Sequence, residues 1–220
     1  MSNIFVYGDS HANYSFQSLP MQTAMPTSSF ENCHKFSITM HRIGRDNHIV
    51  NFDPSKHNQD SVIILCYGEV DCRCHVQRQV DMGRTEDDVI ADLVEAYFTT
   101  IHNNVIVYRQ IIVCAIIPPM HRDKYESVHG PITHEFPFLG SDEDRVRFTQ
   151  KMNVLLQKKC IEHQYTFMNP YGEYTDEYGC LKYELSDTMC HVKDSTMIAE
   201  HTRNIIESSM CDYDQQAWSE

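Results

Sequence analysis

Short apolar runs that alternate with helix-like segments are the feature that most restricts the fold of this 220-residue chain. Five runs have the length and composition of strands, and they cover residues 3–7, 36–40, 61–67, 111–117 and 164–168. The third and fourth runs are apolar almost throughout, which is typical of strands covered on both faces. The alternation predicts an α/β fold, a three-layer α/β/α single domain built on a flavodoxin-like, parallel five-stranded sheet.

The helices between these runs have recognisable beginnings. Thr85 and Ser141 are each followed by three acidic residues, a pattern typical of helix N-termini. Apolar residues then recur at helical spacing through residues 89–101 and 148–160. A further helix is expected after His191. We expect one domain over residues 1–207 and a polar C-terminal tail over residues 208–220.

Composition limits the partners and the compartment. The net charge of −13 argues against nucleic acid as a general partner. No apolar run approaches the ~20 residues of a membrane helix, and residues 1–4 lack the features of a signal peptide, so no membrane insertion is expected. Nine cysteines, an odd number spread through strands and helices, indicate reduced thiols and a cytoplasmic location. The sequence leaves oligomerisation open.

One group of cysteines has spacing that invites a metal interpretation. Cys72, Cys74 and His75 lie close together, but no second cluster with ligand spacing accompanies them. Free thiols near a pocket are therefore the preferred interpretation, and we expect neither a metal nor an organic cofactor.

Polar motifs follow two of the predicted strands. The sequence Gly8-Asp9-Ser10 comes directly after the first strand, and Gly68–Asp71 comes after the third. The carboxyl ends of parallel strands meet at one edge of a sheet, so both motifs are expected there. Ser10 would stand at the start of a helix, where backbone N–H groups stabilise an oxyanion. The simpler interpretation is an ordinary N-cap.

A serine nucleophile needs a base and a group that orients the base. Near the C-terminus, Asp187 precedes His191 by four residues. Histidine is the natural base near neutral pH, and the acid would hold one of its ring nitrogens. The alternative for Asp187 is an N-cap in the turn before the last helix.

In this order, the motifs resemble those of the SGNH hydrolase superfamily, the GDSL-like esterases and acyltransferases. The resemblance makes Ser10 the nucleophile, His191 the base and Asp187 the acid. It assigns the oxyanion hole to the N–H groups of Ser10 and Gly44. We also expect several residues near the motifs to contact substrate: Asp9, His11, Glu69, Asp71 and His75.

Two departures from the family pattern matter. The family's oxyanion-hole asparagine falls on Val70, which has no side-chain donor, and losing one such donor typically costs ~100–1000-fold in rate. Arg73 is the best substitute, and its alternative role is a structural ion pair with Glu69 or Asp71. The second departure is that Asp187 precedes His191 by four positions, where the family's acid precedes its histidine by three.

These observations predict a serine-dependent hydrolase of an O-acyl ester, such as an acetyl group on a sugar or a small polar molecule. The alternatives are an O-acyltransferase that modifies a glycan and a catalytically decayed carbohydrate-binding module. Residues 120–139 form a long irregular stretch that is either a lid or a passive excursion. Its polar side chains favour a hydroxylated or anionic ligand: Arg122, Lys124, His129 and His134.

Overall fold

The computed structural model describes residues 3–19, 29–133 and 135–217. Its sheet contains five parallel strands in the order β2-β1-β3-β4-β5, the flavodoxin-like arrangement that the sequence predicts. The strands are β1 (Asn3–Gly8), β2 (Ser29–Asn32), β3 (Ser61–Cys66), β4 (Gln110–Cys114) and β5 (Thr166–Met168). The order reverses between β1 and β3, and ligands bind such folds where the strand order reverses.

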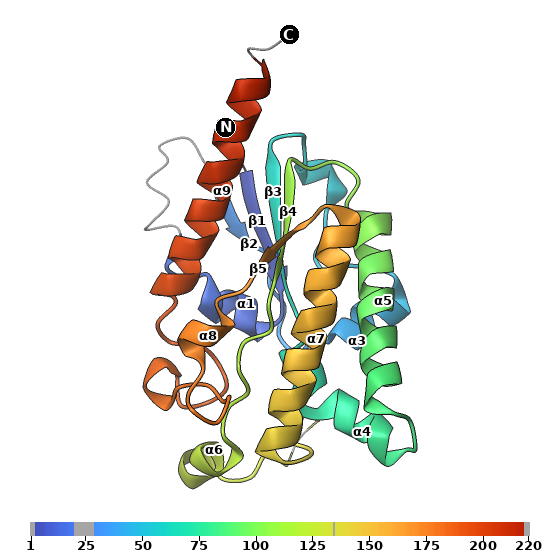
Figure 1. Cartoon of the computed structure of the whole chain (residues 1–220), viewed down its shortest axis with the longest axis vertical. Coiled ribbons are helices and arrows are strands. Elements are labelled where there is room, and N and C mark those ends of the chain that lie inside the picture. The colour runs from blue at the N-terminus through green and yellow to red at the C-terminus, as the bar shows by residue number, and fades with distance from the viewer. Residues whose placement is uncertain (1–2, 20–28, 134, 218–220) are drawn as a thin grey trace.

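Helices cover both faces of the sheet, which Figure 1 shows nearly edge-on. One face carries α3 (Met40–Asp46), α5 (Glu86–Asn104) and α7 (Asp142–His163). The other carries α1 (Ser10–Ser15), α8 (Tyr171–Tyr174) and α9 (Thr196–Ala217). The remaining helices are α4 (Val76–Asp81), which follows a π-helical turn over Asp71–His75, and α6 (Arg122–His129). Short 3-10 turns cover Pro54–Lys56 and Tyr183–Leu185.

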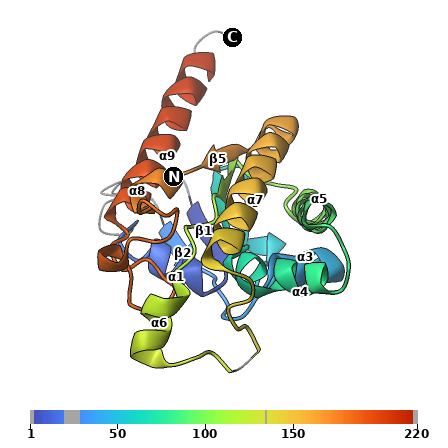
Figure 2. The same ribbon diagram turned by 60° about the horizontal axis from the view of Figure 1, so that its bottom comes forward.

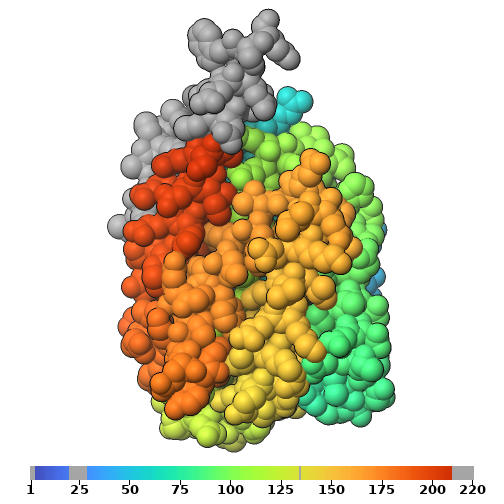
Figure 3. Space-filling view, viewed as in Figure 1, coloured from blue at the N-terminus to red at the C-terminus, as the bar shows by residue number. Residues whose placement is uncertain are grey.

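The period-two pattern of the strands produces two apolar cores. In β1, Phe5 and Tyr7 face the layer of α5 and α7, whereas Ile4 and Val6 face α1 and α9. Both sides of β3 are buried, as its continuous apolar run requires. In the space-filling view, α7, α9 and the orange segment between them close the β5 edge of the molecule (Figure 3).

Capping residues fix the helix starts that the sequence predicts. Thr85 accepts a hydrogen bond from the backbone N–H of Asp88, which begins α5. Ser141 and Asp144 form a reciprocal capping box at the start of α7. Among the described residues, no helix is both long and apolar enough to cross a bilayer.

The predicted strand at 36–40 is wrong. Its apolar alternation comes from a loop that leads into α3, in which Phe36 is 59% exposed. Thr39 caps α3 by accepting from the N–H of Arg42, so the chain turns into a helix where the pattern suggested a strand. The second strand is instead Ser29–Asn32, a short edge strand in which exposed and partly buried residues alternate.

Two boundaries also differ from the sequence expectation. The fourth strand ends at Cys114, because the side-chain amide of Asn153 then bonds both the N–H and the C=O of Ile116 in place of a neighbouring strand. At the C-terminus, α9 continues to Ala217, so residues 208–217 of the predicted polar tail are helical.

Candidate active site

Ser10 is the first residue of α1, at the carboxyl end of β1. Asp9 caps this helix by accepting from the N–H of His11 at 2.8 Å. A Cβ atom at Gly8 would lie 2.3 Å from the Cβ of Ala12 and 2.4 Å from the carbonyl oxygen of Cys66, so the tight turn requires glycine. Asp9 therefore serves as the N-cap, and the same turn presents the Ser10 hydroxyl.

The last loop brings His191 and Asp187 to Ser10. The Nε2 atom of His191 lies 3.0 Å from Ser10 Oγ, and its Nδ1 atom lies 2.8 Å from Asp187 Oδ2. Burial lowers the pKa of His191, but Asp187 and Cys190 together outweigh burial and raise the pKa above its ordinary value. The arrangement matches a nucleophile, a base and an orienting acid joined by hydrogen bonds.

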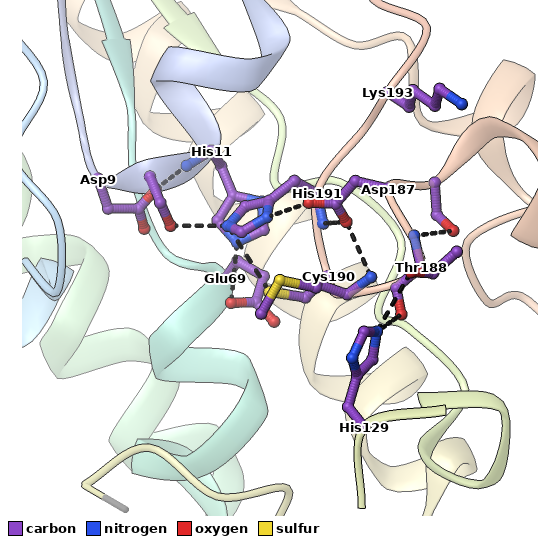
Figure 4. Close-up of polar contacts among 12 residues, drawn as sticks. Asp9, His11, Glu69, His129, Asp187, Thr188, Cys190, His191 and Lys193 are labelled. Atoms are coloured by element: carbon purple, nitrogen blue, oxygen red, sulfur yellow. Dashed lines mark hydrogen bonds and ion pairs between the residues drawn. The ribbon is translucent and has the colours of Figure 1, made fainter. Parts of the chain in front are cut away.

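The four-residue spacing is accommodated by a turn. Thr188 adopts a left-handed conformation with φ of 68°. The Oδ1 atom of Asp187 accepts from the N–H groups of Met189 at 2.9 Å and His191 at 3.1 Å, while Oδ2 holds the imidazole. Figure 4 shows this loop beside His11 and Glu69. Asp194 accepts a hydrogen bond from the backbone N–H of Thr196, the first residue of α9. Asp187 is therefore not the cap of that helix.

A small pocket of about 140 Å³ opens above the serine. It is lined by Ser10, Ser37, Val70, Arg73, Tyr125, Ile132, Phe136, Met189, Cys190 and His191. The wall opposite the serine comes from α6 and the loop after it, which lie at the carboxyl ends of the strands (Figure 2). The long stretch at 120–139 thus contains a helix and contributes apolar and aromatic side chains to the pocket.

The polar side chains predicted to recognise substrate from this stretch have other partners. Arg122 pairs with Glu126 on α6. Lys124 approaches Asp176, and His129 bonds the backbone carbonyl of Thr188. His134 lies outside the described residues. The stretch therefore contributes apolar and aromatic side chains to the pocket in place of the polar side chains expected to favour a hydroxylated or anionic ligand.

A buried charge network lies under the pocket. Glu69 Oε2 lies 3.0 Å from His11 Nε2 and 3.4 Å from Arg73 Nη2. Burial raises the pKa of Glu69, but Arg73 and His11 outweigh it and lower the pKa to about 2. Burial lowers the pKa of His11, whereas Glu69 and Asp9 raise it well above its usual value. His11 and Glu69 are thus ion-paired supports beneath the site, and the predicted ion pair of Arg73 is with Glu69.

Gly44 does not reach the site. It lies inside α3, where a Cβ atom would stand 2.6 Å from the Cβ of Ala96 on α5. Its role is close helix packing, and the oxyanion-hole assignment is corrected. Ser37 lines the pocket instead, from the loop after β2, in a left-handed conformation with φ of 60°.

Three predicted substrate contacts also lie elsewhere. Asp9 is fully buried as the cap of α1. Asp71 is fully buried and accepts from the N–H groups of Met40 and His41 at 2.6 and 3.1 Å, so it anchors the start of α3. His75 stacks on His41 at 4.3 Å and lines a separate hollow between α3 and α5.

Sequence reasoning missed two neighbours of His191. Tyr14 stacks on the imidazole at a centroid distance of 4.2 Å, one helical turn after Ser10. That i,i+4 spacing was the available signal. Cys190 precedes the histidine directly, and its Sγ lies 3.8 Å from His191 Nε2.

Metal-ligating groups come together at two places in the described part of the chain. His11, Cys190 and His191 offer atoms within 4.8 Å of one another, but Arg73 Nη1 lies 3.6 Å from Cys190 Sγ, and its charge opposes a divalent cation. The second group is His121, Asp142 and Cys180, in which the two ring nitrogens of His121 are already hydrogen-bonded to Asp142 and Asp176. Cys72 and Cys74 point to different partners, Met152 and the carbonyl of Val70.

The sequence matches no protein-family model and no curated protein. Solved structures match over most of the chain. A catalytic mutant of an acetylxylan esterase from Geobacillus stearothermophilus has a TM-score of 0.59 at 13% identity, with 93% of each chain covered. A GDSL-like lipase from Bacteroides thetaiotaomicron has a TM-score of 0.57 at 12% identity, covering 94% of this chain and 88% of the lipase. A further acetyl xylan esterase has a TM-score of 0.55 at 12% identity, covering 92% and 98%.

The chain therefore has the α/β/α fold of the GDSL/SGNH hydrolases, as the sequence resemblance predicts. At these identities the likeness concerns the architecture. Any activity has to be argued from the side chains of this chain.

Proposed function

We propose that the protein is a serine-dependent hydrolase of short O-acyl esters. The observation that carries the proposal is the continuous hydrogen-bonded chain from Ser10 Oγ through His191 to Asp187, at 3.0 and 2.8 Å, on the wall of a pocket. Three groups placed in this order are what acyl transfer by a serine requires.

In the proposed mechanism, Ser10 Oγ attacks the ester carbonyl while His191 Nε2 accepts its proton. Asp187 keeps the other ring proton on Nδ1 and stabilises the imidazolium that forms. His191 then protonates the leaving alcohol. A water, deprotonated by the same histidine, releases the acyl group from Ser10.

The tetrahedral oxyanion needs donors in place of the missing asparagine. The backbone N–H of Ser10 stands at the start of α1, and the Arg73 guanidinium lines the same pocket. Glu69 pairs with Arg73 and so fixes the position of the guanidinium, and Glu69 itself does not contact the substrate in this mechanism. We assign the oxyanion to these two groups.

Pocket size favours a short acyl group. At ~30 Å³ per water molecule in the liquid, about 140 Å³ accommodates roughly four or five non-hydrogen atoms, which leaves room for acyl groups from acetyl up to butyryl. Tyr125, Ile132 and Phe136 give this space an apolar wall suited to a methyl or methylene group. The acetyl esterases among the structural neighbours agree with this size.

The test is hydrolysis of acetyl, butyryl and octanoyl esters of p-nitrophenol. We expect kcat/KM to fall at least about tenfold for the octanoyl ester and Ser10→Ala to reduce turnover to the background rate. Ser15→Ala, a buried serine of the same helix outside the pocket, is the matched control and should stay active. Equal turnover by wild type and Ser10→Ala would refute the mechanism, and preference for octanoate would refute the substrate class.

An O-acyltransferase would use the same residues with a sugar hydroxyl in place of water. The test distinguishes the two activities when a sugar acceptor is added, because transfer yields a new sugar ester and hydrolysis yields free acid. The preserved hydrogen-bonded chain argues against the decayed binding module.

A further inference from the structure

Cys190 places a thiol inside the site, in contact with the proposed base. Its Sγ lies 3.8 Å from the same His191 Nε2 atom that bonds Ser10, and the residue lines the pocket. Figure 4 shows its sulfur between His191 and Glu69. The thiol has no role in the proposed mechanism, but it contacts His191, the base on which the reaction at Ser10 depends.

Cationic groups surround the sulfur. Arg73 Nη1 lies 3.6 Å from Sγ, and a ring nitrogen of His11 lies within 4.8 Å. Arg73 is 8% exposed, and its buried Nε has no hydrogen-bond partner among the described residues. Arg73 also lines the pocket, so its positive charge stabilises an anion that forms beside the thiol.

Because of these neighbours, the pKa of the Cys190 thiol differs from that of other cysteines in the chain. Burial and Glu69 raise the pKa of Cys190, but His11, His191 and Arg73 outweigh them and lower it to about 7. Burial instead raises the pKa of Cys33 to about 11, and that of Cys74 to about 12. A thiolate is the reactive form of cysteine, and Cys190 combines it with access from the pocket.

We propose that Cys190 is a peroxide-sensitive modification site that switches off the adjoining serine. The inhibition rests on the proposed ester hydrolase activity, whereas the modification itself does not. Small hydroperoxides are the oxidants that fit the pocket.

The chemistry is a two-electron oxidation of sulfur. The thiolate attacks one peroxide oxygen, an S–O bond forms as the O–O bond breaks, and hydroxide leaves and takes a proton from the buffer. Sulfur loses the two electrons that the peroxide gains, and the product is a sulfenic acid. A small thiol then forms a mixed disulfide with release of water, and a second thiol regenerates Cys190.

Oxidation stops the serine for geometric reasons. The new oxygen on Sγ occupies part of a pocket of about 140 Å³ and competes with Ser10 for His191 Nε2. It also accepts a hydrogen bond from the Arg73 guanidinium, whose Nη1 lies beside Sγ, and so engages the proposed oxyanion donor.

The experiment treats the intact wild-type protein with hydrogen peroxide and traps sulfenic acid with a 1,3-dione probe, read by peptide mass. We expect the probe on Cys190 before any other cysteine, and ester hydrolysis to fall in parallel and to recover with a small thiol. In a separate alkylation with iodoacetamide at pH 7, Cys190 should react about a hundredfold or more faster than Cys33, because of its larger thiolate fraction.

The controls are Cys190→Ser and Cys33→Ser, each compared with its own untreated rate. Only the first should become insensitive to peroxide. The inference is overturned if Cys190 takes up no probe, or if Cys190→Ser loses activity to peroxide as the wild type does. The peptide masses of the wild-type protein show whether Cys190 is modified, so this result does not depend on the folding of either variant. An adduct on Cys190 in a protein without esterase activity would refute the proposed function and leave the modification site standing.

Discussion

Replacing Asp187 by asparagine isolates the orienting role of its carboxylate. The Oδ1 atom accepts from two backbone N–H groups, those of Met189 and His191, and an asparagine oxygen can keep both bonds. The amide NH2 would then face His191 Nδ1, where Oδ2 stands in the wild type. The imidazole must bear its proton on Nε2, so it can no longer accept one from Ser10.

The size of the effect follows from this reversal. The turn survives, so we expect the free energy of unfolding to change by less than ~1 kcal/mol. The base is lost, so kcat/KM should fall by about 10³–10⁴-fold, or ~4–5.5 kcal/mol of transition-state stabilisation. Loss of the carboxylate also removes the largest of the effects that raise the pKa of His191, so this pKa should decrease.

The assay is acetyl-ester hydrolysis, with urea unfolding measured in parallel. Asp194→Asn is the matched control, because this aspartate caps α9 on the same segment and lies outside the pocket. A fall of less than about tenfold in Asp187→Asn would refute the assignment of Asp187 as the orienting acid.

Three further predictions concern the base, the missing donor and the misplaced glycine. Since neutral His191 is the active form and its pKa is raised, kcat/KM of the wild type should be low in acid and rise with pH through a value above 6.5; a rate independent of pH between 5 and 9 would contradict this. Val70→Asn should increase kcat/KM by about tenfold or more by restoring a side-chain donor beside Ser10, and an unchanged rate would show that the missing donor does not limit catalysis. Gly44→Ala should destabilise the fold by ~1–3 kcal/mol through contact with Ala96 and leave the rate of the folded enzyme unchanged, whereas a rate loss without destabilisation would return this glycine to the oxyanion hole.

Local sequence signals are sufficient to predict most of the strands and helices and the motif that carries the serine. The apolar run of β3, the caps Thr85 and Ser141, and the motif at residues 8–10 each carry their structural reason within a few residues. Strand order and the shared edge then follow from general rules for parallel sheets.

The errors arise where a distant residue decides. At Met40, the carboxylate of Asp71 accepts the backbone N–H and helps a helix to begin where alternation indicated a strand. The resemblance assigns Gly44 to the oxyanion hole, but this glycine lies within α3, a helix that the local pattern does not indicate. The sequence around Cys190 does not indicate a reactive thiol, because the cationic neighbours Arg73 and His11 come next to it only in the folded chain.

Reaction with a fluorophosphonate probe, followed by intact-mass and peptide-mass measurement, tests the central claim most directly. The account predicts a single adduct on Ser10 in the wild type, and none in Ser10→Ala or His191→Ala samples that retain the wild-type circular dichroism spectrum. A folded wild-type protein that takes up no probe, or that takes it up equally in either variant, would contradict an activated serine at this site.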